Sequence, residues 1–247
     1  MNVALAPSLP TRADEDFRYS DLAALEALWP VAAEQRVLAA GEGDRLVLVC
    51  EGAEPVARKL VVTLGEGARY DLRVLNCGTA FGRIEVDVEL ADGADFMLGA
   101  AQLGTSGQTL EIVTTVRHTG EGATSRQVVR SVLGGAATGT YLGRVAVARG
   151  ATGTDAEQSV RAMLLDRTAT ANARPELEIF ADDVKCAHGC AVGELDATGL
   201  FYLQSRGLTP AQAKRLMLQA FVAEAFVGAA DEDSLNAAAL AVLEAAL

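Results

Sequence analysis

The sequence is poor in lysine and histidine, and each shortage argues against a class of function. The 247 residues include three lysines, Lys59, Lys185 and Lys214, and none lies in a Gly-Lys-[Ser/Thr] phosphate loop. We therefore expect no ATP to be bound by this chain. There are two histidines and no serine with the spacing of a nucleophile elbow, which argues against a serine hydrolase.

Positive charge and long apolar runs are also scarce. The chain has 21 Lys and Arg against 33 Asp and Glu, which gives a formal net charge of −12. A surface this acidic repels phosphate backbones and anionic lipid. Nucleic acid is therefore not an expected partner. No apolar run approaches the ~18 residues that a membrane helix needs, so no membrane span is expected.

Cysteine is too rare for a disulfide framework. Four cysteines and an amino terminus without a secretory pattern predict a cytoplasmic protein. Cys50 and Cys77 each end an apolar run, and burial is the expectation for both. His118 lies beside a turn, and we expect it to be at the surface or hydrogen-bonded.

Short β-type runs fill the chain from Arg45 to about Glu178, each bounded by Gly, Asp or Asn. Gly67, Gly93, Gly122 and Gly150 each leave a turn as Gly-Ala, at steps of 26, 29 and 28 residues. A repeat of that length is typical of a solenoid whose coils bury their faces on one another. The spacing and the 5% aromatic content favour a β-helix. A β-sandwich is the alternative.

Helical patterns lie at both ends. Leu22, Leu25 and Leu28 have helical spacing before Pro30. Near the other end, Asp196 is a good N-cap for a helix to about Ser205, and Thr209-Pro210 is a good start for a second helix that ends near Gly228. This second helix is apolar over more than one face, which indicates core or an interface.

The run Asp182-Asp183-Val184-Lys185-Cys186-Ala187-His188-Gly189-Cys190 concentrates half the cysteines and one histidine. On a strand, Cys186, His188 and Cys190 share one face, and thiolate with imidazole suits iron–sulfur clusters or zinc. Alternate side chains lie ~6.5–7 Å apart, so one strand cannot close a metal site and a bend or a second chain must complete it. The competing interpretation is two buried cysteines beside a hydrogen-bonded histidine.

Residues 154–221 closely resemble the SufB/SufD family of iron–sulfur cluster assembly proteins, and its SufD branch in particular. The resemblance rests on the Asp-Asp-Val-Lys-Cys-x-His-Gly run, on Pro175-Glu-Leu-Glu-Ile and on Leu200-Phe-Tyr-Leu with Ser205-Arg-Gly. Residues 9–22 also look like the SufD amino-terminal pattern. Ala187 and Gly189 flank His188 where the SufB branch has acidic residues. Two features depart from the family: the amino-terminal helical region is short, and Cys190 replaces an alanine.

The resemblance implies a mainly β protein with a right-handed parallel β-helix and a carboxy-terminal helical domain. We expect a helical lead-in over residues 1–43, a β-helix core over 44–193 and a helical domain over 194–247. The implied function is a non-catalytic scaffold of the SUF system that pairs with a SufB-like chain and with a SufC-like ABC-type ATPase. Isolated, such a chain is expected to form a homodimer through the strand that carries the motif.

The same resemblance implies a nascent iron–sulfur cluster, held transiently at the subunit interface, with His188, Cys186 and Cys190 as candidate ligands. It implies contact with the ATPase through the terminal helices, where Arg206, Leu216, Phe221 and Phe226 are the candidates. Reduced flavin bound by the complex is a further implication. Two other functions stay open: a structural β-solenoid interaction module with no cluster, and a metal-dependent enzyme that uses the same three residues.

Overall fold

The computed structural model describes residues 8–244, and the outer ends of the expected segments 1–43 and 194–247 lie outside this range. Twelve strands form two six-stranded sheets. Sheet A contains the odd-numbered strands β1 (Ala33–Leu38), β3 (Val56–Leu64), β5 (Phe81–Leu90), β7 (Thr109–His118), β9 (Thr138–Val147) and β11 (Thr170–Ile179). Sheet B contains the even-numbered strands β2 (Gly43–Cys50), β4 (Arg69–Cys77), β6 (Asp95–Gly104), β8 (Thr124–Leu133), β10 (Asp155–Leu164) and β12 (Lys185–Gly193).

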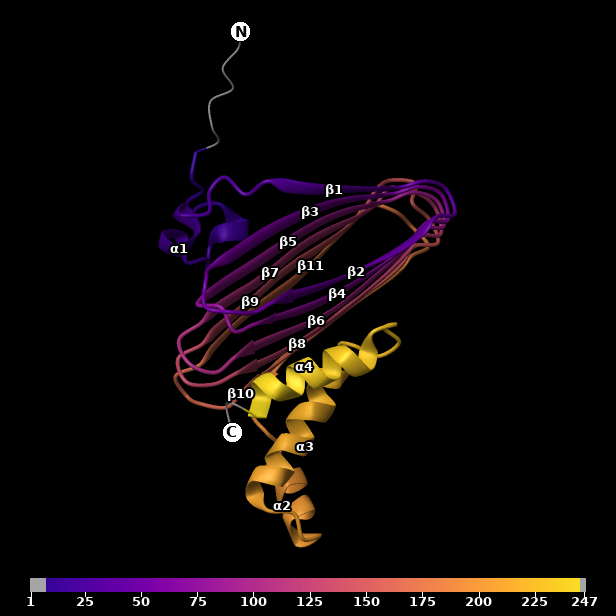
Figure 1. The fold of residues 1–247 in the computed structure, drawn as a ribbon. Coiled ribbons are helices and arrows are strands. Elements are labelled where there is room, and N and C mark those ends of the chain that lie inside the picture. The colour runs from indigo at the N-terminus through magenta and orange to yellow at the C-terminus, as the bar shows by residue number, and fades with distance from the viewer. Residues whose placement is uncertain (1–7, 245–247) are drawn as a thin grey trace.

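Every pair of neighbouring strands is parallel, and consecutive strands alternate between the two sheets. The chain therefore winds as a flattened parallel β-helix, drawn in Figure 1 as two tilted layers. The core lies between the layers, where inward residues of both sheets such as Leu60, Val62, Leu72 and Val74 are completely buried. The predicted β-helix is confirmed, and the sandwich alternative is wrong.

One turn is repeated on the edge of the solenoid that precedes each strand of sheet B. Gly41, Gly67, Gly93, Gly122 and Gly153 each have a positive φ two residues before such a strand. In each pair of adjacent coils the glycine N–H donates to the next turn, as from Gly93 to the carbonyl of Glu121 at 2.8 Å. A left-handed backbone favours glycine, so a glycine recurs in the sequence once in each of these turns.

The predicted series of turn glycines is wrong at one position, Gly150. Gly150 also has a positive φ, but the glycine that stacks on Gly122 is Gly153, two residues before β10. In the last of these turns Asp183, with φ of 53°, takes the place of the glycine. Its carbonyl accepts a hydrogen bond from Gly153 N–H at 2.9 Å. The turn around Gly150 is longer than those before it, so the Gly-Ala pattern shifted out of register there.

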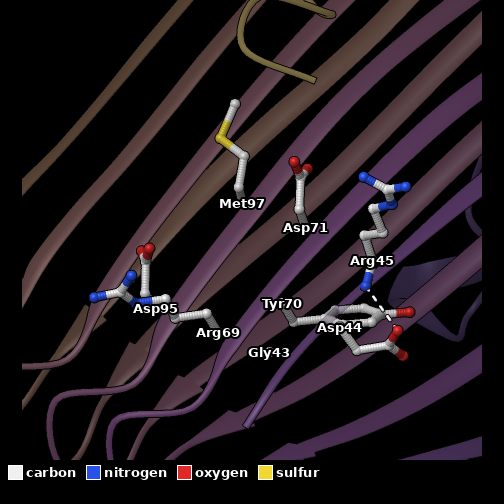
Figure 2. Close-up of a pocket in the computed structure, with 8 residues that line it drawn as sticks. All are labelled: Gly43, Asp44, Arg45, Arg69, Tyr70, Asp71, Asp95 and Met97. Atoms are coloured by element: carbon white, nitrogen blue, oxygen red, sulfur yellow. Dashed lines mark hydrogen bonds between the residues drawn. The ribbon is translucent and has the colours of Figure 1, made fainter. Parts of the chain in front are cut away.

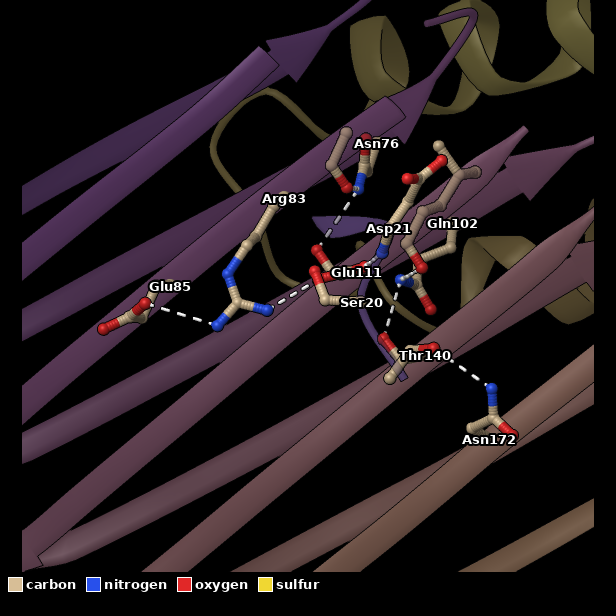
Figure 3. A network of polar contacts seen from close by, with 11 residues as sticks. Ser20, Asp21, Asn76, Arg83, Glu85, Gln102, Glu111, Thr140 and Asn172 are labelled. Carbon is tan, nitrogen blue, oxygen red and sulfur yellow. Dashed lines mark hydrogen bonds and ion pairs between the residues drawn. The ribbon is translucent and has the colours of Figure 1, made fainter. Parts of the chain in front are cut away.

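The amino-terminal segment docks on the outer face of sheet A (Figure 3). It contains a 3₁₀ turn, η1 (Glu15–Phe17), and the predicted short helix α1 (Leu22–Glu26). Ser20 Oγ donates to Glu111 Oε2 at 2.9 Å, and Arg83 Nη1 donates to the same oxygen at 2.6 Å. Arg83 also lies 4.1 Å from the centre of the Phe17 ring. A buried ion pair therefore anchors the segment.

Strand β1 lies inside residues 1–43, where only a helical lead-in was expected. It pairs with β3 over its whole length. Its inward residues include Glu34 and Arg36, which align with Leu60 and Val62 of β3. Charged inward residues remove the apolar alternation by which a strand is recognised from sequence.

Three carboxy-terminal helices, α2 (Ala197–Ser205), α3 (Pro210–Ala223) and α4 (Glu232–Glu244), lie on the outer side of sheet B. The Asp196 cap and the Thr209 capping box start the first two, as predicted. Leu218, Leu235 and other apolar residues of α3 and α4 pack on Leu75, Ala101 and Leu103 of the sheet. Helix α2 packs on α3 and extends away from the sheet (Figure 1).

Candidate functional site

Strand β12, which carries the cysteine and histidine motif, is the last strand of sheet B. It pairs on one side with β10, with Gly193 opposite Met163 and Lys185 opposite Asp155. Its other side has no neighbour in the described chain. The motif therefore lies on an open edge at one end of the solenoid.

The register places the three candidate ligands on the inward side of this strand. Cys186, His188 and Cys190 lie opposite Ala156, Gln158 and Val160, which are all buried in the interior of the solenoid. Cys186 is half-buried and packs against that core, whereas His188 and Cys190 are exposed. Since the last coil has no further coil over it, inward side chains of β12 face the open end.

Both thiols are less acidic than an ordinary cysteine. Burial raises the pKa of Cys186, against a lowering by the hydrogen bond with the backbone of Ala156. Partial burial also raises the pKa of Cys190. The thiolate is the ligand form, so iron or another cation must displace the proton when it binds.

These side chains do not form a closed metal site by themselves. Among residues 8–244, no group of three or more His, Cys, Asp and Glu side chains is arranged to hold a metal ion. Successive inward residues on a strand are ~6.6 Å apart, which is too wide for one tetrahedral ion. The soft donor set fits an iron–sulfur cluster if a second chain supplies the remaining ligands.

The backbone of the open edge is available at the same residues. Lys185 N–H donates to the carbonyl of Thr154, just before β10, so the backbone groups of the odd residues of β12 face β10 and those of the even residues face the free edge. Cys186, His188, Cys190 and Val192 thus present their N–H and C=O groups to the free edge. A strand added there would lie beside the three candidate ligands.

The neighbouring free edge, on β11, is less suited to pairing. Thr170 N–H donates to Ala137, just before β9, and the N–H of Phe180, just after β11, donates to Val147 of β9, so the backbone groups of the odd residues of β11 face the open side. Pro175 is one of them and has no N–H to offer. Of the two strands at this end, β12 is the one with a complete set of donors.

The opposite end of the solenoid is closed to such pairing by charge. Glu34, Arg36 and Asp44 point inward there, and Arg58 of the next coil forms a bidentate ion pair with Glu34 at 2.7 and 2.8 Å. Inward-pointing charges on edge strands are a known protection against edge-to-edge association. At the β12 end the exposed inward side chains include the apolar Ile179 and Val192, and the exposed Phe180 follows β11.

Sequence reasoning missed Phe180, which is 65% exposed. It follows Ile179 directly, and neighbouring residues on a strand point to opposite faces. Two adjacent large apolar residues at a strand end cannot both enter the core. That signal was present in the run Glu-Leu-Glu-Ile-Phe.

Of the four candidate partner-binding residues on the helices, two are exposed and two are at least partly buried. Leu216 is 47% exposed, and the exposed Arg206 lies over the Tyr202 ring at 5.1 Å. Phe221 is half-buried near Arg130, and Phe226 is completely buried against sheet B. Phe226 therefore holds the helices on the sheet, which agrees with the core alternative for this residue rather than the interface one.

The exposed apolar surface of the helices lies mainly on α2. Phe201 is 73% and Tyr202 55% exposed, and no residue of α2 is buried. We call Phe201, Tyr202 and Leu216 the helical patch. Neither aromatic residue was among the partner-binding candidates from the sequence, because the apolar content of α2 has almost no helical periodicity to point to one face.

The other cysteines and histidine lie away from the open edge. Cys50 and Cys77 are buried as predicted, and burial raises the pKa of Cys77 to about 11. His118 is completely buried in the core, 2.8 Å from Ser125 Oγ through Nε2, so its hydrogen-bonded alternative is right and its surface alternative is wrong. Burial lowers the pKa of His118 to about 4.

A surface hollow of about 520 Å³ lies over the first residues of β2, β4 and β6 (Figure 2). Arg45 and Arg69 line it together with Asp44, Asp71 and Asp95. The side chains that line it include no cysteine or histidine, and the two signs of charge are mixed. This hollow has no chemistry in common with the β12 edge.

None of the helices in the described part of the chain is long and apolar enough to cross a membrane. Residues 56–221 match the family model described as "SUF system FeS cluster assembly, SufBD core domain". This match includes β12, the turn before it and most of α3.

Curated relatives agree with the family model. The iron–sulfur cluster assembly protein SufD of Escherichia coli is 34% identical over 119 residues, which cover 48% of this chain and 28% of that protein. A SufBD family protein of Synechocystis, slr0076, is 32% identical over 166 residues, 66% of this chain and 36% of its own length. Protein ABCI7, chloroplastic, of Arabidopsis thaliana is 33% identical over 160 residues, 64% and 34% respectively. The chain thus spans about a third of the length of these relatives.

Proposed function

Because the chain belongs to the SufBD family of the SUF system for iron–sulfur cluster assembly, we propose that it is a SufD-like scaffold subunit. It pairs with a SufB-like subunit along the free edge of β12. The observation that supports this most strongly is the coincidence of two features on the even residues of β12: unpaired backbone groups and the candidate ligands Cys186, His188 and Cys190.

Pairing at this edge brings a second set of ligands to the inward face of β12. Each chain has too few suitably placed donors to close a site, so a cluster built there is shared between subunits. The cluster is the cargo of the scaffold and leaves when assembly is complete. An isolated chain would pair with a second copy of itself through the same edge, because β12 has no partner of its own.

The two kinds of ligand bind iron in different ways. The neutral imidazole of His188 binds iron directly through a nitrogen lone pair. Cys186 and Cys190 must lose a proton first, and their raised pKa values make that step dependent on the cation. We therefore assign the first contact with iron to His188 and assign the two thiols to later coordination.

The helices are the proposed seat of a SufC-like ATPase. The helical patch lies on α2 and α3, α2 extends from the solenoid, and Arg206 lies over the ring of Tyr202 in the patch. ATP is bound and hydrolysed by that partner, so this chain is a non-catalytic subunit. Reduced flavin in the complex stays a prediction that a flavin fluorescence titration would check.

Anaerobic reconstitution with iron and sulfide tests the proposal. We expect cluster absorbance from the chain with SufB-like and SufC-like partners, and a loss of at least about tenfold in yield for His188→Ala. Lys185→Ala is the matched control, since Lys185 is exposed on the same strand but on the outward side. Equal yields for the two variants would refute the cluster role and favour a structural interaction module.

A further inference from the structure

One inward row of sheet B changes from apolar to polar along the solenoid. The row runs in register across all six strands through Leu46, Leu72, Leu98, Gln127, Gln158 and His188. Its first half is the aliphatic core. Its second half is polar and ends at the candidate ligand on the open edge.

The polar half is held from inside the solenoid by sheet A. Tyr141 donates its hydroxyl to Gln127 Oε1 at 3.1 Å and accepts a hydrogen bond from Gln158 Nε2 at 3.2 Å. Thr114 Oγ1 donates to Gln127 Oε1 at 2.8 Å. Gln158 is completely buried, so its amide has a fixed place beside β12.

The other end of this amide is unpaired. Gln158 Oε1 is buried and has no hydrogen-bond partner within the described residues. A buried carbonyl oxygen without a donor costs free energy, and a native protein normally supplies one. Because Nε2 is turned toward Tyr141, Oε1 lies on the other side of the amide carbon.

His188 is the next residue of the row, and residues in register on adjacent strands are ~4.8 Å apart. Its imidazole carries one N–H when neutral, and it is exposed and free to rotate toward the sheet. Histidines that bind metals almost always donate their second ring N–H to a carbonyl or carboxylate. We infer that Gln158 is a positioning residue for His188, accepting this N–H through Oε1.

This inference rests on the proposed function, because the role of His188 as an iron ligand is part of that proposal. The contact fixes one tautomer and leaves the lone pair of the other nitrogen directed to the open end. Tyr141 keeps the amide from rotating, so the chain of contacts runs from Tyr141 through Gln158 to His188. The polar interior residues Tyr141 and Gln158 thereby orient the imidazole of the exposed His188.

Gln127 offers a competing donor. Its Nε2 is also buried and unpaired, and it neighbours Gln158 on the other side of the row. Tyr141 already joins the two amides on that side, which is why we place Oε1 toward His188. If Gln127 were the donor, the tautomer of His188 would not depend on Gln158.

Nitrogen NMR of the full chain labelled with ¹⁵N-histidine separates these outcomes. Only two histidines give signals, and His118 is identified by its burial. At about pH 8 we expect His188 to hold one dominant tautomer. In Gln158→Leu it should revert to the mixture of a free imidazole, and in Gln158→Glu the dominant tautomer should return.

Gln102→Leu is the matched control. Gln102 is a completely buried inward amide of the same sheet, but it bonds to Leu110 and Thr140 backbone carbonyls far from His188. An unchanged His188 spectrum in Gln158→Leu would overturn the inference. If that variant fails to fold, Tyr141→Phe releases Gln158 instead, and an unchanged tautomer there would overturn it equally.

Cluster formation supplies a second readout. We expect Gln158→Leu to lower iron affinity in the partner complex by about tenfold, within the range typical of residues behind a ligand. The two proposals fail separately. A normal cluster yield in His188→Ala removes the ligand role but leaves the tautomer result intact, whereas an insensitive tautomer removes Gln158 but leaves the ligand role intact.

Discussion

Gly99 of sheet B lies against the backbone of the segment that follows α3. An added Cβ would lie 1.9 Å from the carbonyl oxygen of Ala225 and 2.5 Å from Nη1 of Arg73. Neither atom is free to move, because Arg73 Nη1 donates to that carbonyl at 3.0 Å and anchors the end of the helical segment. We expect Gly99→Ala to push the helices off the sheet.

The expected cost is about 3 kcal/mol, the upper part of the range for overpacking, because the clash involves backbone and a hydrogen-bonded guanidinium. A cost of that size raises the undocked population of the helices about 100-fold. Hydrogen exchange followed by mass spectrometry should show faster exchange in α3 and α4, while β6 and β8 keep their protection.

Gly43→Ala is the matched control, since an added Cβ there meets nothing within 4 Å. Gly99→Ala should also bind the ATPase partner more weakly than Gly43→Ala does, because the docked helices present the helical patch. Equal exchange rates in α3 for the two variants would refute the reasoning that close backbone contact at Gly99 sets the helical domain in place.

Three further predictions follow from the turns, the edge and the core. Val192→Pro should abolish self-association in light scattering while Val192→Ala does not, since only proline removes an N–H from the free edge; equal masses would contradict this. Asp183→Gly should stabilise the chain by about 0.5–1 kcal/mol in denaturant unfolding, because Asp183 has φ of 53°. His118, with its pKa lowered to about 4, binds its proton more weakly folded than unfolded. Stability should therefore fall by about 3 kcal/mol as the pH drops from about 6.5 to 4, and His118→Asn should remove that part of the slope.

The fold was predictable where sequence signals are local. Glycine turns and short apolar runs mark the coils, and Asp196 and Thr209-Pro210 mark helix starts, because each depends on a few adjacent residues. Strand β1 was not predicted, because its inward residues Glu34 and Arg36 lie at the open end of the solenoid, where a charged residue need not be buried in the core. Whether a strand belongs to the end coil of a stack depends on how the coils assemble, which the local pattern does not reveal.

The site was predictable in part. Alternation along a strand placed Cys186, His188 and Cys190 on one face, since it needs only the two-residue period. The fate of Phe226 depended on where α3 docks, and the neighbourhood of Gln158 depended on the register of strands about thirty residues apart. Long-range register is fixed by the whole solenoid, so no local pattern could supply it.

A hyperfine measurement on the assembled cluster tests the central claim most directly. The chain is labelled with ¹⁵N-histidine, combined with unlabelled partners, loaded with iron and sulfide and reduced for pulsed electron paramagnetic resonance. His118 is buried in the solenoid core, so a strongly coupled ¹⁵N nucleus can come only from His188. We predict this coupling in the wild-type complex and its loss in His188→Ala. A cluster that forms in full yield without any ¹⁵N coupling would contradict the account.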